Sequence, residues 1–394
     1  MQAFNPSSLS RVLVRATNWL GDAVMSLPAL RCLRTVFPHA HLAVLARPSV
    51  SGLYERERYL DQVIVYPRMK GLGARREFAA GLRAQRFDGA ILLQNAFDAA
   101  LIAWLAEIPE RIGYDRDARG LLLTRAVAVP EPGDIPRHER FYYLELLRRA
   151  GMIERYPECH EIRLDGLDEA RAAGAAHFTA LGAGEAVVGV SPGAAYGNAK
   201  RWLPERFAES ARQAADALGA TVAVFGAASE RTLCESVAEM VRRAGIDARN
   251  LAGETSLREF IDLAAACRVF LTNDSGAMHV ASAVGTPTVA VFGATDDATT
   301  GPTGALARVV REHAECSPCL LRECPIDHRC MTRVTVERVA AELLSMSPPG
   351  LARSENPTLP RGRGSAWGSV ASSVFHQSSG GATPIDNRPG GRSH

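Results

Sequence analysis

The chain alternates between short runs of β-branched and apolar residues and longer stretches in which apolar positions recur with helical spacing. This alternation is typical of β–α units, so it predicts parallel sheets covered by helices. In the first half of the chain we expect strands over residues 11–16, 41–46, 62–66 and 88–94, and helices over about 22–36, 73–85, 97–106 and 138–151.

A second series of β–α units begins near residue 185. A strand within 185–193 runs into a loop rich in Gly and Pro, a helix follows over 204–218, and three more strands are expected in ATVAVFG, RVFLTND and PTVAVFG. Two such series predict an α/β protein with two Rossmann-like domains, residues 1–165 and 185–346, joined within 160–184. Ligands of such sheets bind beyond the carboxyl ends of the strands, so candidate site residues are sought there.

The last segment, residues 347–394, has a different composition. It is rich in Pro, Gly, Ser and Arg and has few residues that can build a core. Such a composition predicts a disordered tail. The tail is interpreted either as a solvated extension or as a segment that touches a membrane.

The composition and charge of the chain bear on whether it binds nucleic acid or membranes. The 394 residues carry a formal net charge of +2, so no overall charge favours nucleic acid as a partner. The N-terminus lacks the apolar segment of a signal peptide, and no apolar run is long enough to cross a bilayer. We therefore expect a cytoplasmic protein. Only two of the 45 basic residues are lysines, Lys70 and Lys200.

The first candidate site follows the first predicted strand, in the segment NWLGDAV. The pair Gly21–Asp22 stands at a strand-to-helix turn, which places the carboxylate in the first turn of the helix. One interpretation is a residue that only stabilises the helix start, where the macrodipole favours negative charge. The other is a general base at the mouth of a cleft between the domains.

The second candidate site is the segment SPGAAYGNAKRW, which precedes the helix predicted over 204–218. Small residues such as Gly193 let the backbone approach a ligand closely. Lys200 then offers a mobile point charge suited to a phosphate. The alternative is an ordinary loop with exposed basic residues.

The third candidate site is the segment TNDSGAMH, where a strand ends in a polar turn and a helix begins. Backbone amides at Ser275 and Gly276 would form an anion site suited to a pyrophosphate. Asp274 would face a sugar, because a carboxylate can accept hydrogen bonds from sugar hydroxyl groups. His279 lies one helical turn on and towards the same face, although a lone histidine is also commonly a packed core residue.

Two further features have alternative interpretations. Glu230, after the strand ATVAVFG, is either a ribose ligand of the nucleotide-fold type or a first-turn helix residue. Four cysteines cluster with the spacing Cys316-x2-Cys319-x4-Cys324-x5-Cys330. They are interpreted as a structural zinc site, as reduced packed thiols or as a reversible disulfide.

Taken together in this order, NWLGDAVMSLPALRCLR, SPGAAYGNAKRW and NDSGAMHVASAVGTPTVAVFG resemble the ADP-heptose:lipopolysaccharide heptosyltransferases, glycosyltransferase family 9. The stretch CSPCLLRECPIDHRCM is most similar to the heptosyltransferase II branch. The resemblance covers about residues 10–345. A Rossmann oxidoreductase is disfavoured, because ATNWLGDA and not G-x-G-x-x-G follows the first strand.

The resemblance implies a GT-B fold, in which two Rossmann-like domains face each other across a cleft. It implies an acceptor held mainly by the N-terminal domain, an ADP-sugar held mainly by the C-terminal domain and an inverting transfer without a metal or other cofactor. The resemblance implies that Asp22 is the catalytic base and that Lys200 neutralises the charge on the departing diphosphate. It also implies donor-binding roles for Asp274, for the Ser275–Gly276 amides and, by a looser match, for Glu230.

The reaction implied is transfer of L-glycero-D-manno-heptose from ADP-heptose to the heptosyl-Kdo2-lipid A inner core of lipopolysaccharide. The alternative is a related enzyme such as heptosyltransferase I or III with a different acceptor. Because the acceptor is anchored in lipid, the resemblance also implies peripheral contact with the cytoplasmic face of the inner membrane. Five arginines of the N-terminal half are candidates for that surface: Arg31, Arg34, Arg47, Arg75 and Arg76.

Overall fold

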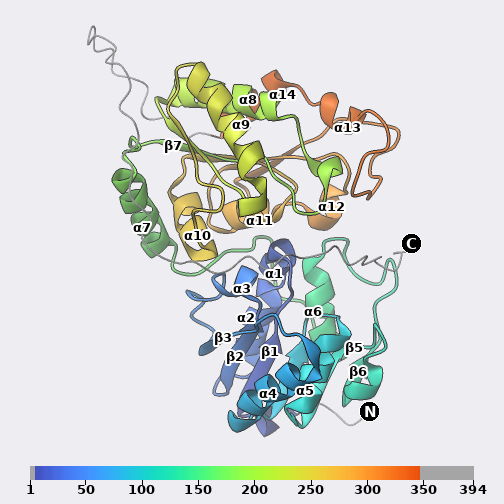
Figure 1. Ribbon diagram of the computed structural model, residues 1–394. Helices are drawn as coiled ribbons and strands as arrows, with labels where there is room; N and C mark the ends of the chain where they lie inside the picture. The colour runs from blue at the N-terminus through green and yellow to red at the C-terminus, as the bar shows by residue number, and fades with distance from the viewer. Residues whose placement is uncertain (1–4, 347–394) are drawn as a thin grey trace.

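The computed structural model describes residues 5–346, so the tail predicted as disordered lies outside the described residues. Two β–α series follow each other along the chain (Figure 1). The first comprises β1 Arg11–Arg15, α1 Leu20–Met25, α2 Leu27–Val36, β2 His41–Ala46, α3 Pro48–Ser51, β3 Gln62–Val65, α4 Gly71–Ala84, β4 Gly89–Leu92, α5 Phe97–Leu105, β5 Glu110–Tyr114, β6 Arg125–Val127 and α6 Arg140–Arg149. The second comprises α7 Leu167–Ala180, β7 Val187–Ser191, α8 Pro204–Leu218, β8 Thr221–Val224, α9 Arg231–Arg243, β9 Ala248–Asn250, α10 Leu257–Ala266, β10 Val269–Asn273, α11 Gly276–Ala283, β11 Thr288–Val291, α12 Asp297–Thr300, β12 Ala307–Val310, α13 Arg329–Thr332 and α14 Val336–Ser345.

Each series forms one six-stranded parallel sheet with the same strand order. The first sheet runs β3-β2-β1-β4-β5-β6 and the second runs β12-β11-β10-β7-β8-β9. Both are the Rossmann order, in which the direction of strand addition reverses between the first and fourth strands. The switch points therefore lie between β1 and β4 in one sheet and between β7 and β10 in the other. The predicted α/β class with two Rossmann-like sheets is confirmed.

The helix predicted over about 22–36 is two helices. α1 ends at Met25, and α2 begins at Leu27 with Pro28 in its first turn. A proline lacks a backbone N–H and clashes with the preceding turn, so it is tolerated at a helix start and disfavoured inside a helix. The proline thus ends the short helix that carries Asp22 and lets a new helix begin.

The second series opens with α7, which lies within the predicted connection over residues 160–184. The pattern of apolar residues did not predict this helix. This helix is rich in alanine and has little contrast between its faces. It packs closely on α10, because a Cβ atom at Gly174 would lie 2.0 Å from the backbone oxygen of Asp262. The contact holds the connecting helix against the second series.

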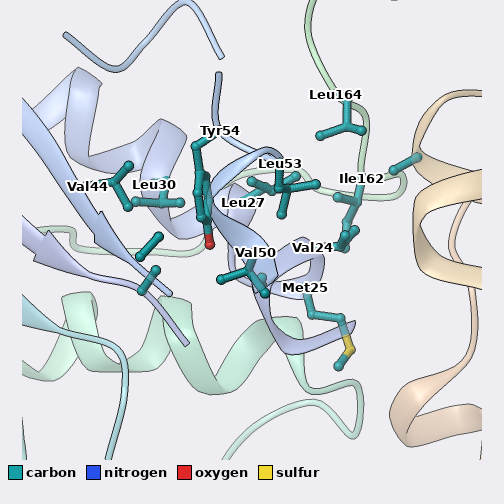
Figure 2. Close-up of a cluster of buried hydrophobic side chains, with 14 of the residues drawn as sticks. Val24, Met25, Leu27, Leu30, Val44, Val50, Leu53, Tyr54, Ile162 and Leu164 are labelled. Carbon is teal, nitrogen blue, oxygen red and sulfur yellow. The ribbon is translucent and has the colours of Figure 1, made fainter. Parts of the chain in front are cut away.

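A hydrophobic cluster spans the junction between the two series (Figure 2). Figure 2 shows Ile162 and Leu164 of the connecting segment in one cluster with Val24 and Leu27 of α1 and α2. The backbone N–H of Leu164 donates to the carbonyl of Ala283 in α11 at 3.0 Å. The connecting segment is therefore bonded to the second series while its side chains pack on the first.

The carboxyl ends of the two sheets meet at helices α1 and α11. A Cβ atom at Gly276 would lie 2.8 Å from the Cβ of Leu20, so the helix starts are in close contact. An ion pair between Arg56 and Asp262 joins the two series beside this contact. Among residues 5–346, none of the helices is both long and apolar enough to cross a membrane.

Candidate functional site

Asp22 lies in the first turn of α1, directly beyond the carboxyl end of β1. Its carboxylate is partly exposed, and its negative charge adds to burial in raising the pKa of Tyr143. The ring of His279 lies against the preceding residue, since a Cβ at Gly21 would be 3.0 Å from the His279 Cδ2. Asp22 therefore lies next to the interface between the two series, where a carboxylate could act on a ligand bound between them.

Lys200 and Asp274 come together across the switch point of the second sheet. Lys200 lies in the loop beyond β7, and Asp274 follows β10 directly. The Lys200 Nζ is 2.6 Å from the Asp274 Oδ2, and the hydroxyl of Thr295 donates to the same oxygen. Because the Asp274 side chain is only 5% exposed, this carboxylate is a fixed anchor for the ammonium group.

Asn273 fixes the loop that carries Lys200, a role that sequence reasoning missed. Its Nδ2 donates to the carbonyl of Pro192 at 2.7 Å, and its Oδ1 accepts from the N–H of Trp202 at 2.9 Å. The amide is fully buried and bonds to both ends of the loop. The only signal in the sequence was a polar residue at the end of an apolar strand.

Glu230, which follows β8, packs its carboxylate against Gly193, which follows β7. The Glu230 Oε2 accepts from the N–H of Ala227 at 3.0 Å. A Cβ at Gly193 would lie 2.2 Å from the Glu230 Oε1, so only glycine leaves room for the carboxylate. Arg201 lies 4.0 Å from the same carboxylate. The carboxylate is thus held over the glycine loop.

Ser275 and Gly276 begin α11 as predicted. Ser275 is the residue that precedes the helix, and its side chain does not cap the helix. Its Oγ lies 3.3 Å from the hydroxyl of Thr272. The start of α11 therefore combines unsatisfied helix amides with the neighbouring Lys200, a suitable environment for an anion.

His279 connects the groups from both series. Burial lowers its pKa to about 4; the charges of His138 and Lys200 act in the same direction, while that of Asp274 opposes them. The imidazole is therefore neutral at neutral pH. Its ring also lies against Gly21, so His279 packs the second series against the turn that carries Asp22.

The depressed pKa of His279 predicts a pH-dependent stability. An ordinary histidine in the unfolded chain titrates near pH 6.5, so between pH 6.5 and about 4 the unfolded state binds more protons. The free energy of unfolding should fall as pH falls through this window, by on the order of 3 kcal/mol in all. Urea unfolding of wild type and His279→Gln at several pH values would isolate this effect. Parallel pH profiles for the two proteins would contradict it.

The four clustered cysteines are free thiols that range from the exposed Cys316 to the buried Cys330. Burial, followed by the charges of the other three, raises the pKa of Cys330. Within residues 5–346, no group of three or more His, Cys, Asp or Glu side chains is arranged to hold a metal ion. The zinc interpretation therefore has no support from the described residues.

Comparisons with known proteins agree with this arrangement. The model of glycosyltransferase family 9 (heptosyltransferase) matches residues 75–329. Lipopolysaccharide heptosyltransferase 2 of Salmonella typhimurium is 33% identical over 308 residues, which cover 76% of this chain and 88% of that protein. Lipooligosaccharide heptosyltransferase 2 of Haemophilus influenzae is 30% identical over 329 residues, again covering 76% and 88%.

Solved structures show the same similarity. E. coli ADP-heptose LPS heptosyltransferase II superposes with a TM-score of 0.72 at 30% identity, covering 85% of this chain and 98% of that one. This likeness confirms the predicted GT-B fold. A family 9 glycosyltransferase of Veillonella parvula shares the fold, with a TM-score of 0.72 at 22% identity and coverage of 86% and 97%. The family match over most of the length, the 33% identical relative and the common fold show that the chain belongs to glycosyltransferase family 9, the heptosyltransferases, and is a glycosyltransferase.

Proposed function

We propose that this glycosyltransferase moves a heptose from ADP-heptose to a heptosylated, lipid-anchored core of lipopolysaccharide. The observation that carries the proposal is the packing of His279 against Gly21, which brings the turn that contains Asp22 next to the series that contains the Lys200–Asp274 pair. The names of the most similar relatives, lipopolysaccharide heptosyltransferase 2 and ADP-heptose LPS heptosyltransferase II, support this donor and acceptor.

The donor is proposed to lie along the carboxyl ends of β7, β8 and β10. Glu230 accepts hydrogen bonds from the ribose hydroxyls beside Gly193, and the amides at Ser275 and Gly276 bind the phosphates. Asp274 accepts hydrogen bonds from hydroxyl groups of the heptose. The proposed ribose ligand thus follows β8, and the proposed phosphate and heptose ligands follow β10.

Asp22 is proposed to remove the proton of the acceptor hydroxyl as its oxygen attacks the anomeric carbon of the heptose. The bond from that carbon to the phosphate oxygen breaks on the opposite face, so the configuration inverts and ADP leaves with the bonding electrons. Lys200 and the helix amides stabilise the negative charge that grows on the leaving diphosphate. Neutral His279 adds no positive charge against the turn that carries Asp22.

We also propose that the enzyme is a peripheral protein of the cytoplasmic face of the inner membrane, because its proposed acceptor is anchored there in lipid. Of the five arginines that the sequence offered for this surface, three pair with carboxylates inside the fold: Arg31, Arg34 and Arg75. Arg47 and Arg76 have no carboxylate within ion-pair distance among residues 5–346. The Arg47 guanidinium lies over the ring of Tyr66, whereas Arg76 is exposed, so Arg76 is the better candidate for an acidic surface.

A Gly193→Ala variant tests the ribose role of Glu230. The new methyl group would displace the flexible carboxylate, so the fold should survive while the KM for ADP-heptose rises about fivefold, the effect of one lost hydrogen bond. Gly184→Ala is the matched control, because nothing lies within 4 Å of a Cβ there. Equal KM values in the two variants would remove Glu230 from the ribose site.

The overall proposal is tested by measuring the nucleoside diphosphate released from each of a set of donors, with each of a set of acceptors. ADP-heptose should be used in preference to UDP- or GDP-sugars, and Kdo2-lipid A carrying one heptose in preference to acceptors carrying none or two. Preference for the acceptor without heptose would indicate heptosyltransferase I activity, and preference for the one with two would indicate heptosyltransferase III. Folded protein that uses none of them would contradict the proposal.

A further inference from the structure

The loop that carries Lys200 is bound along its length by the cysteine-rich segment, residues 314–330. The N–H of Ala199 donates to the carbonyl of Arg322 at 3.0 Å, and the N–H of Cys324 donates to the Asn198 Oδ1 at 3.3 Å. A Cβ at Gly197 would lie 2.1 Å from that same Arg322 carbonyl oxygen. These contacts are too close for the two segments to move independently.

Tyr196 lies between two cations at this contact. The Lys200 Nζ is 5.0 Å from the centroid of its ring, and the Arg322 Cζ is 5.2 Å from the same centroid. The Tyr196 hydroxyl donates to the carbonyl of Leu320 at 3.0 Å, which fixes the ring to the cysteine-rich segment. Cations are attracted to the face of an aromatic ring, so the Tyr196 ring stabilises both charges in its neighbourhood.

The charges at this point do not balance within the described part of the chain. Asp274 is the carboxylate that pairs with Lys200. Across residues 5–346, no carboxylate lies within ion-pair distance of the exposed Arg322. Two cations next to one ring are thus balanced by one buried carboxylate, an arrangement that favours a negatively charged ligand.

We propose that Arg322 is a second cationic ligand of the donor diphosphate, held in place by Tyr196. The inference rests on the proposed function, which places the diphosphate at Lys200. It extends the donor site to the cysteine-rich segment, which lies far from the Lys200 loop in sequence. A guanidinium group can donate two hydrogen bonds to one phosphate, whereas Lys200 acts as a point charge.

Calorimetric binding of ADP and adenosine to the full chain tests this role. Arg322→Gln should weaken ADP binding about tenfold or more, the effect of a lost charge-assisted hydrogen bond, and leave adenosine binding unchanged. The ADP affinity of the variant should also depend less on salt. Arg322→Lys should recover part of the loss. Arg243→Gln, an exposed arginine of α9, is the matched control and should bind like wild type.

The outcomes separate this inference from the proposed function. An Arg322→Gln variant that binds ADP within twofold of wild type, or that loses ADP and adenosine equally, would overturn the role of Arg322 alone. Wild-type protein that binds no ADP would overturn the proposed function and the inference with it. Selective loss of ADP binding, with partial recovery in Arg322→Lys, is the result we expect.

Discussion

Asp22→Asn should reduce turnover by at least about 100-fold and up to about 10,000-fold, the range that a general base contributes. The amide has the same shape as the carboxylate but cannot accept the proton of the acceptor hydroxyl. Binding of ADP-heptose should change little, because Asp22 belongs to the first series of β–α units and the proposed donor ligands to the second. Single-turnover kinetics together with donor binding would measure the two effects separately.

Asp168→Asn is a matched control for this variant. Asp168 also lies in the first turn of a helix, α7, and its side chain is 97% exposed. If Asp22 only stabilised the start of α1, both variants would lose a similar fraction of a kcal/mol in stability, about 0.3–1 kcal/mol, and both would keep full activity. Full activity of Asp22→Asn would therefore return this residue to the purely structural interpretation.

Lys200→Gln should lower turnover by about 100- to 1,000-fold, as expected when a group that stabilises the charge of a transition state is removed. It should also weaken donor binding, since the ammonium is proposed to contact the diphosphate before and during its departure. The buried carboxylate of Asp274 keeps the hydrogen bond from Thr295, so the protein should remain folded. Steady-state kinetics with ADP-heptose would show both effects.

The chain provides its own control for Lys200. Lys70 is the only other lysine, and it is exposed at the start of α4. Lys70→Gln makes the same chemical change far from β7 and β10, so it should leave kinetics unaltered. Equal kinetics for the two variants would mean that Lys200 belongs to an ordinary loop.

Elements with continuous apolar runs were predictable from the sequence. β1, β7 and β10 are buried along nearly their whole length, and each contains a run of three or more apolar residues or glycine. The strands β5 and β6 and the helix α7 were not predicted. β5 begins with the charged pair Glu110–Arg111, β6 has three residues, and α7 has weakly contrasting faces. In these elements tertiary packing, and not the local pattern, determines the structure.

The candidate site was predictable where it depends on strand ends. Asp22, Lys200 and Asp274 each follow a predicted strand, and parallel strands bring their carboxyl ends to one edge of a sheet. The contact of His279 with Gly21 and the contact of Arg322 with the Lys200 loop join segments that are more than 100 residues apart. The first contact depends on how the two sheets face each other and the second on how distant loops of the second series pack, and local sequence encodes neither.

The most direct test of the account is analysis of the product that the purified chain forms from ADP-heptose and Kdo2-lipid A carrying one heptose. The account predicts one added heptose with inverted anomeric configuration, an equal amount of released ADP, and product formation at least about 100-fold slower with Asp22→Asn. Recovery of unchanged acceptor from folded protein that binds ADP-heptose, or a product with retained configuration, would contradict it.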